Sequence, residues 1–206
     1  MTWYQWLAII SLAYCGLICV YHFIRLIKLG KPVDFSEKTG NTGSGIRYSY
    51  TGAMKPSAKE SAYLNLPTYA AGLVFHLGTF FAIALFFFFL FNMIFPLWFE
   101  WIAALCLGIS GICGLAILLK RIFSKELRSF SNPDDYISNM LVTGFQLATA
   151  IVLFVPVFVI PYFLIAASLL IYLPAGKLKH TVYFFAARYH LGYFFGWRNV
   201  WPPKKV

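Results

Sequence analysis

Charged side chains are scarce in this chain: Asp, Glu, Lys and Arg make up 12% of its 206 residues, whereas 60% are hydrophobic. Soluble domains carry about 25% charged residues, so this composition excludes an ordinary soluble globular protein. A helix needs about 20 apolar residues to cross the hydrocarbon core of a bilayer, and the sequence holds five stretches of that kind. We therefore predict an all-α membrane protein, a single membrane domain over residues 1–206 with a cytoplasmic loop at 29–68. The predicted helices cover about 3–24, 69–94, 97–119, 137–157 and 158–178.

Acidic residues are fewer than basic ones, with 7 Asp and Glu against 17 Lys and Arg, which gives a net charge of +10. The basic residues fall in the connections 25–59 and 120–128 and in the segment after residue 176, all on one side of the predicted helices. The positive-inside rule makes that side cytoplasmic, so we expect the N-terminus outside and the C-terminus inside. Basic residues that border membrane helices attract anionic headgroups or an acidic partner, and we expect no nucleic-acid binding.

Metal-binding cysteine motifs are missing. The four cysteines lie inside the predicted helices 3–24 and 97–119, and no Cys-x-x-Cys pattern occurs, so zinc, iron–sulfur and covalently attached haem lack ligands at a suitable spacing. Charged residues are also missing from the middle of every predicted helix, which argues against a transporter or channel for charged substrates.

Histidine is rare, and two of the four histidines carry the functional hypothesis. Asn92 and Pro161 mark the outer turns next to the two helices. His76 lies 16 residues before Asn92, and His180 lies 19 residues after Pro161. At about 1.5 Å of rise per residue, both imidazoles are roughly 24 to 29 Å from the outer surface. A facing imidazole pair at one depth is what a b-type haem iron requires. Taken singly, His76 also fits a packing residue and His180 a headgroup-facing one.

The two remaining histidines are assigned no such role. We expect His22 at the membrane interface and His190 beyond the fifth helix, and we interpret both as interface or solvated residues.

Three segments, 71–78 (AGLVFHLG), 118–128 (LLKRIFSKELR) and 172–180 (YLPAGKLKH), resemble the membrane-anchor family of the respiratory nitrate reductase gamma subunit. That family includes the cytochrome b subunits of heterodisulfide reductases. The resemblance covers nearly the whole chain and implies five membrane helices that bind b haems, usually two. His76 and His180 match the ligands of the haem on the cytoplasmic side.

The chain departs from the family pattern at the outer haem. The corresponding positions hold Phe86 and Tyr162, and Phe cannot bind iron, so we expect one haem b and not two. Lys120 and Arg121 match family positions near the edge of the cytoplasmic haem. They are candidates for contacts with the haem propionates, and equally for two ordinary positive-inside charges.

The function implied by the resemblance is electron transfer between membrane quinone, as substrate, and a cytoplasmic iron–sulfur subunit. The chain would be the electron-transfer subunit of a quinone-linked oxidoreductase in a prokaryotic respiratory chain, embedded in the cytoplasmic membrane, without catalytic residues of its own. The alternative is a haem-bearing anchor that does not react with quinone.

Two connecting segments have distinct compositions. Residues 38–45 are rich in Gly, Ser, Thr and Asn and predict a flexible loop. Residues 131–135 (SNPDD) predict a turn and an N-cap for the helix that follows.

Overall fold

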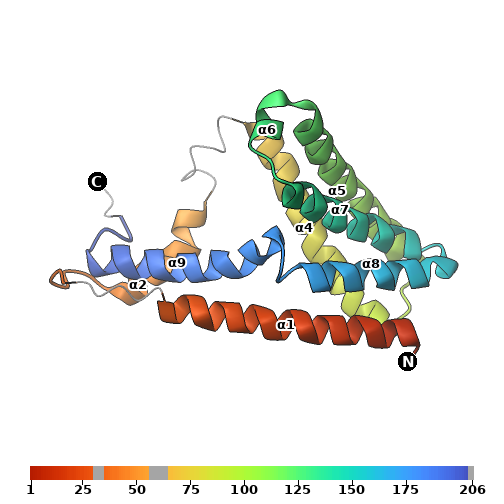
Figure 1. The fold of residues 1–206 in the computed structure, drawn as a ribbon, viewed down its shortest axis with the longest axis horizontal. Helices are drawn as coiled ribbons and strands as arrows, with labels where there is room; N and C mark the ends of the chain where they lie inside the picture. The colour runs from red at the N-terminus through yellow and green to blue at the C-terminus, as the bar shows by residue number, and fades with distance from the viewer. Residues whose placement is uncertain (30–34, 56–64, 204–206) are drawn as a thin grey trace. The chain divides into compact units, whose positions relative to one another are not determined.

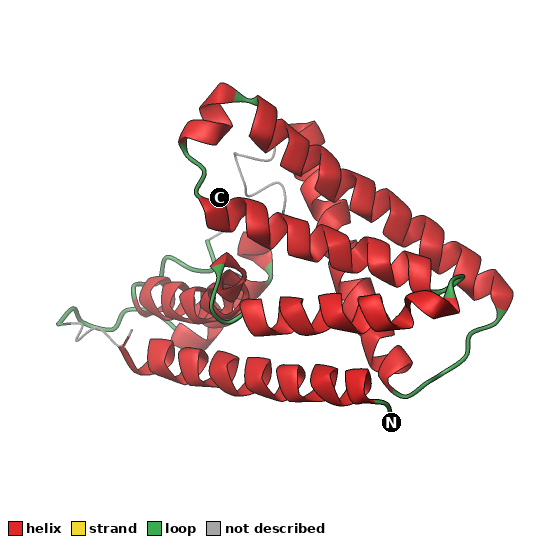
Figure 2. Ribbon diagram, turned by 45° about the vertical axis from the view of Figure 1, so that its right-hand side comes forward, coloured by secondary structure: helices red, strands yellow, loops and turns green. Residues whose placement is uncertain are grey.

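Helices joined by turns make up the fold. The computed structural model describes residues 1–29, 35–55 and 65–203, and within these ranges it contains helices but no strand (Figure 1, Figure 2). The predicted all-α fold class is therefore confirmed. The α-helices are α1 (Trp3–Leu29), α2 (Thr42–Tyr50), α4 (Leu66–Leu90), α5 (Leu97–Phe123), α6 (Lys125–Ser129), α7 (Pro133–Val152), α8 (Val159–Tyr172) and α9 (His180–Trp197). The short 3-10 turns are η1 (Gly52–Met54), η3 (Pro156–Phe158) and η4 (Lys177–Lys179).

Fewer helices qualify as membrane spans than the sequence predicts. Within the described ranges three helices, α1, α4 and α5, are long and apolar enough, and the broken pair 156–172 and 177–197 adds a fourth if it forms one span. These helices are compatible with an integral membrane protein. The five-span arrangement and its orientation stay predictions.

The predicted helix 158–178 is wrong at its end. Helix α8 stops at Tyr172, a turn containing Pro174 and Gly176 follows, and His180 is the first residue of α9. Pro174 has no N–H to donate to the helix, and the N–H groups of Ala175 and Gly176 both bond to the Tyr172 carbonyl, so the chain turns before it reaches His180. The segment beyond residue 178, which the sequence left outside the predicted helices, forms an 18-residue helix instead.

The described chain divides into two units, and each is considered by itself. Unit 1 contains residues 1–15 and 66–178, and unit 2 contains residues 16–65 and 179–206. In unit 1, α4, α5 and α7 lie side by side and α8 packs against α7 (Figure 1).

A buried amide joins the three central helices of unit 1. Gln146 of α7 is fully buried, and its Nε2 donates to the Phe75 carbonyl at 3.0 Å and to Thr79 Oγ1 at 2.6 Å. Ser110 of α5 donates to Gln146 Oε1 at 2.6 Å. Polar groups without partners are costly in an apolar interior, so this network fixes how α4, α5 and α7 align.

The first half of α1 belongs to unit 1 and packs near the end of α4. Gln5 donates to Asn92 Oδ1 at 2.8 Å, and the Tyr4 ring stacks on Phe163 with centroids 5.4 Å apart. Asn92 has φ of +53°, a left-handed conformation that Asn tolerates better than most residues.

In unit 2, α2 packs directly against α9. A Cβ built on Gly45 would lie 2.3 Å from the Gly192 carbonyl oxygen, so the two backbones are too close for any side chain there. Asn41 caps α2 by accepting a hydrogen bond from the Ser44 N–H at 3.0 Å. The predicted flexible loop 38–45 is therefore wrong from Thr42 onward, because capping and contact with α9 outweigh a glycine-rich composition.

Close helix packing in unit 1 predicts different effects of alanine at two glycines of α4. A Cβ on Gly78 would lie 1.9 Å from Ser110 Oγ and 2.3 Å from Ser110 Cβ, whereas a Cβ on Gly72 meets nothing within 4 Å. We expect Gly78→Ala to lower the free energy of unfolding by about 1–3 kcal/mol, because the neighbouring helix must shift. The matched control Gly72→Ala should be neutral or mildly stabilising. Reversible unfolding in mixed detergent measures both, and equal effects would contradict the observed packing.

Candidate functional site

His76 lies on the outward face of α4. The opposite face of this helix buries Phe75 and Gly78, while His76 is exposed in a row of apolar residues. Its neighbours on that face are Leu73, Leu77 and Phe80, which are 52%, 61% and 65% exposed. An ionisable ring on the apolar surface of a candidate membrane span is a functional candidate.

His180 opens α9 and is also exposed. It follows directly after the short turn η4 and belongs to unit 2, whereas His76 belongs to unit 1. The shared iron that joins these two histidines therefore stays a prediction.

His22 and His190 both hold helices of unit 2 together. The His190 Nε2 lies 3.2 Å from the Leu26 carbonyl oxygen, so this nitrogen carries the hydrogen and donates it. The His22 ring meets the Tyr183 ring edge-on, with centroids 6.4 Å apart. These contacts join the second half of α1 to α9 and give both histidines a structural role.

Phe86 and Tyr162, the positions that replace the outer haem ligands of the resembling family, lie in one packed aromatic cluster. Phe86 is 3% exposed and Tyr162 is fully buried. The Phe86 ring contacts Phe145 and Phe163 at centroid distances of 6.5 and 6.2 Å, and Phe145 stacks on Tyr162 at 5.9 Å. The two positions are therefore filled by packed aromatic side chains.

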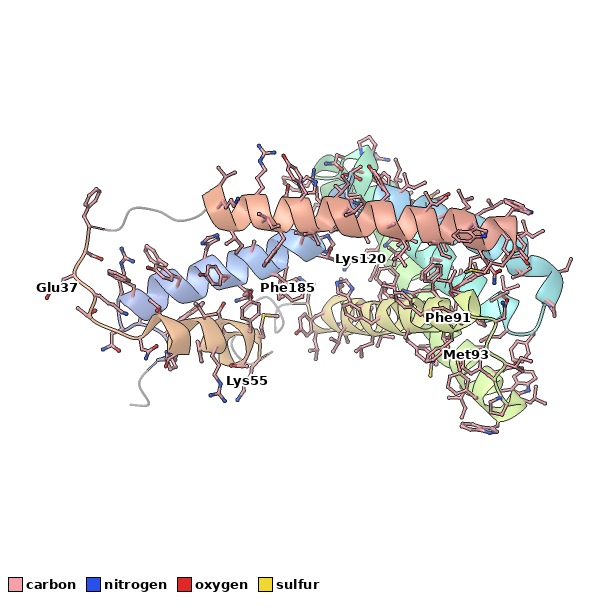
Figure 3. The ribbon with its side chains drawn as sticks, turned by 90° about the horizontal axis from the view of Figure 1, so that it is seen from below. Glu37, Lys55, Phe91, Met93, Lys120 and Phe185 are labelled. Carbon is pink, nitrogen blue, oxygen red and sulfur yellow. The ribbon has the colours of Figure 1, made fainter. Side chains whose placement is uncertain are left out.

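Lys120 and Arg121 point to different neighbours at the end of α5. Lys120 donates to Thr68 Oγ1 at 2.7 Å, near the start of α4; Figure 3 labels Lys120. Arg121 donates to Ser131 Oγ at 2.9 Å and lies 3.4 Å from Asp135 Oδ1. Their assignment to haem propionates stays a prediction, and Arg121 already has an anionic partner.

Asp135 is the centre of a charged cluster that sequence reasoning missed. Its side chain is 4% exposed and pairs with Arg121 and with Lys177. Its Oδ2 also accepts the Asn132 N–H at 3.0 Å, while Asn132 Oδ1 accepts the Asp135 N–H, which completes a capping box. The predicted N-cap run at 131–135 is thus confirmed. The capping signal was readable in the sequence, but nothing local pointed to the two cations.

The same cluster sets the protonation of Asp135. Burial alone raises the pKa of this carboxyl, but the hydrogen bond from Lys177, the Asn132 N–H and the Arg121 charge together hold its pKa below the ordinary value. Next to it, Asp134 accepts hydrogen bonds from the Tyr172 hydroxyl and from Ser138 Oγ, the latter at 3.3 Å. The start of α7 is therefore tied to α5, to the end of α8 and to the turn that precedes α9.

A cavity of about 370 Å³ opens at the other end of unit 1. The Tyr162 hydroxyl borders this region and has no hydrogen-bond partner among the residues that the structure describes. The nearby Thr149 hydroxyl donates to the Phe145 carbonyl at 2.6 Å. The lining residues are Phe89, Asn92, Met93, Ile94, Phe95, Glu100, Val152, Leu153, Pro156, Val159 and Tyr162.

This cavity lies far from His76 along α4. Phe89, one of its lining residues, is 13 positions after His76 on the same helix. At 1.5 Å per residue the separation along α4 is about 20 Å. A molecule in this cavity would not touch a haem bound at His76.

The ion pairs of Asp135 predict an acid-sensitive contribution to stability. A carboxyl whose pKa is lowered by folding stabilises the native state above its unfolded pKa, and this stabilisation is lost as the pH falls through the folded pKa. We expect Asp135→Asn to lower the free energy of unfolding by about 1.5–3 kcal/mol near neutral pH, because it removes hydrogen bonds to a charged group. The difference from the parent protein should begin to shrink below about pH 4, where the unfolded carboxyl becomes protonated, and disappear only as the pH falls through the lower folded pKa.

Thermal unfolding of both proteins between about pH 7 and about pH 3 measures this difference. The matched control is Glu126→Gln, an exposed carboxyl in α6 that should give a loss of less than about 0.5 kcal/mol. A pH-independent difference between Asp135→Asn and the parent would contradict the role of the charge.

Comparison with known proteins adds no assignment: no protein-family model, no curated protein and no solved structure matches this chain. The family resemblance therefore remains a hypothesis that depends on the residues given above.

Proposed function

We propose that this chain is a b-type cytochrome subunit that carries electrons between membrane quinone and a cytoplasmic iron–sulfur partner. One haem b is held by His76 and His180. The observation that carries the proposal is His76, an imidazole exposed on an otherwise apolar face of a candidate membrane span. A bound haem would cover that ring and supply it with an iron ligand bond.

The donor set suits the group. Two neutral imidazoles are the ligands of low-spin b haems, and the exposed rings of His76 and His180 are both accessible to a macrocycle. Haem, when bound, supplies one-electron exchange at its iron. The protein supplies two imidazole nitrogens, and the apolar residues around His76 keep water away from the site.

The aromatic cluster supports one haem and not two. Phe86 and Tyr162 do more than lack iron-binding nitrogens, because both are buried in contact with Phe145 or Phe163. Opening a second haem pocket there would empty a packed core, at a cost of several kcal/mol for each large side chain displaced.

The proposal includes five membrane helices, an external N-terminus and location in a prokaryotic cytoplasmic membrane. Helix α7 would be one of the five although its polar residues lower its hydropathy. Its most polar central side chains, Gln146 and Thr149, are fully buried between helices, whereas Met140 and Ile151 are 61% and 42% exposed. The surface that α7 offers to lipid is therefore apolar, as a membrane helix requires.

Removing either histidine should remove the haem. We expect His76→Ala and His180→Ala each to abolish the b-type absorption spectrum while the protein still inserts in the membrane, because each leaves the iron without an axial ligand. His190→Gln is the matched control, since glutamine keeps an N–H donor for the Leu26 carbonyl. A pyridine haemochrome assay should give about one haem per chain in the parent protein and in the control. Two haems per parent chain, or an unchanged spectrum in His76→Ala, would contradict the proposal.

Reaction with quinone separates the proposed function from the alternative of a quinone-inert anchor. We expect a quinol added to the purified haem-loaded protein to reduce the haem, with a quinone-site inhibitor blocking the reaction. The change in the haem α-band measures reduction, and dithionite gives the fully reduced reference. Reduction by dithionite but not by quinol would favour the anchor.

A further inference from the structure

Unit 2 is strongly basic. Its described residues include eight Lys and Arg and one acidic residue, Glu37, which Figure 3 labels in the segment ahead of α2. This imbalance is larger than in the whole chain, where 17 basic residues face 7 acidic ones. The eight are Arg25, Lys28, Lys38, Arg47, Lys55, Lys179, Arg188 and Arg198.

Helix α9 runs beside the second half of α1. The contacts of His190 with the Leu26 carbonyl and of His22 with Tyr183 join the two helices. The helix α1 is a candidate membrane span whose second half exposes apolar residues such as Leu17, which is 72% exposed. Helix α9 therefore accompanies the end of a membrane helix, which is where lipid headgroups lie.

Arg188 of α9 and Arg198, the residue that follows its last turn, both lie beside aromatic rings. Phe185 is 53% exposed and Phe194 is 40% exposed. Figure 3 labels Phe185. The Arg188 guanidinium lies 5.5 Å from the centroid of the Phe184 ring, and that of Arg198 lies 3.7 Å from the Phe194 ring. Each cation thus sits beside an exposed ring, the combination by which helices bind the boundary between headgroups and acyl chains.

Helix α2 fixes α9 from its other side. Ser49 Oγ donates to the Arg188 carbonyl at 2.7 Å, and the Tyr50 hydroxyl donates to the Phe185 carbonyl at 2.5 Å. With the glycine contacts between these helices, the hydrogen bonds hold the backbone that carries the arginine side chains. The pair α2 and α9 is therefore a preorganised surface, in which Arg47 and Lys38 add to the positive charge.

We infer that this α2–α9 surface binds the headgroups of anionic phospholipids, with Arg188 and Arg198 contacting the phosphates and the neighbouring rings inserted among the acyl chains. An acidic protein would match the charge equally well. The exposed rings beside a candidate membrane span favour a lipid, because a bilayer buries them without any further partner. The inference is independent of haem and quinone binding.

Lipid binding to the purified full chain in detergent tests the inference. Native mass spectrometry gives the affinities for phosphatidylglycerol and phosphatidylcholine. We expect phosphatidylglycerol to bind more tightly, and Arg188→Gln with Arg198→Gln to weaken it by about 10- to 30-fold, since each cation near an anionic surface contributes roughly fivefold. The charge-preserving pair Arg188→Lys and Arg198→Lys should lose less than about threefold.

A matched pair of substitutions removes the same charge from unit 1. Lys125→Gln with Arg128→Gln, both exposed in α6, should weaken phosphatidylglycerol binding by less than about threefold. Circular dichroism and gel filtration of every variant verify that the fold is kept. Equal losses in the two glutamine pairs, or equal affinity for both lipids, would overturn the inference.

Two further outcomes identify another ligand and also overturn it. Displacement of phosphatidylglycerol by glycerol phosphate at similar concentration would mean a site for soluble phosphate. If the Arg188→Gln with Arg198→Gln variant loses an acidic protein that the parent binds, while its lipid binding is unchanged, the surface is a protein interface.

Discussion

The alignment of the central helices depends on one buried side chain, the amide of Gln146. In an apolar surrounding a carboxamide has no water to pair with, so its two ends must find partners on neighbouring helices. It finds them on α4 through the Phe75 carbonyl and on α5 through Ser110. Because the contacted carbonyl belongs to the residue just before His76, the same bonds fix the rotation of α4. They turn Phe75 inward and leave the adjacent imidazole on the outside.

Different interactions stabilise the two ends of unit 1. The end at Asp135 is held by charge: one buried carboxylate joins Arg121 of α5 to Lys177 ahead of α9. The opposite end is held by aromatic packing around Phe86 and Tyr162 and contains the cavity.

Sequence patterns predicted what depends on composition and local chemistry. Hydropathy located α1, α4 and α5, and the Asn-Pro-Asp-Asp run located the start of α7, because apolar length and capping are properties of short segments. The patterns failed where contacts between distant residues decide. Thr42 to Gly45 form part of a helix because α9 packs on them, and Asp135 receives Lys177 from 42 positions away. The residues near Thr42 and near Asp135 in the sequence do not indicate that α9 or Lys177 will contact them. The pairing of His76 with His180 was predicted from their similar depth along the helices. The two residues belong to separate units, so an experiment on the protein must test whether they share an iron.

The aromatic cluster has a bioenergetic consequence. A membrane subunit with two stacked redox centres moves electrons across the bilayer and thereby contributes to the membrane potential. In the proposed one-haem arrangement, the buried Phe86 and Tyr162 occupy the place of the outer haem with side chains that carry no electrons at physiological potentials. Electrons would then enter and leave on the inner side, and each turnover would be electrically silent, so any energy conserved would have to come from proton chemistry or from the partner enzyme.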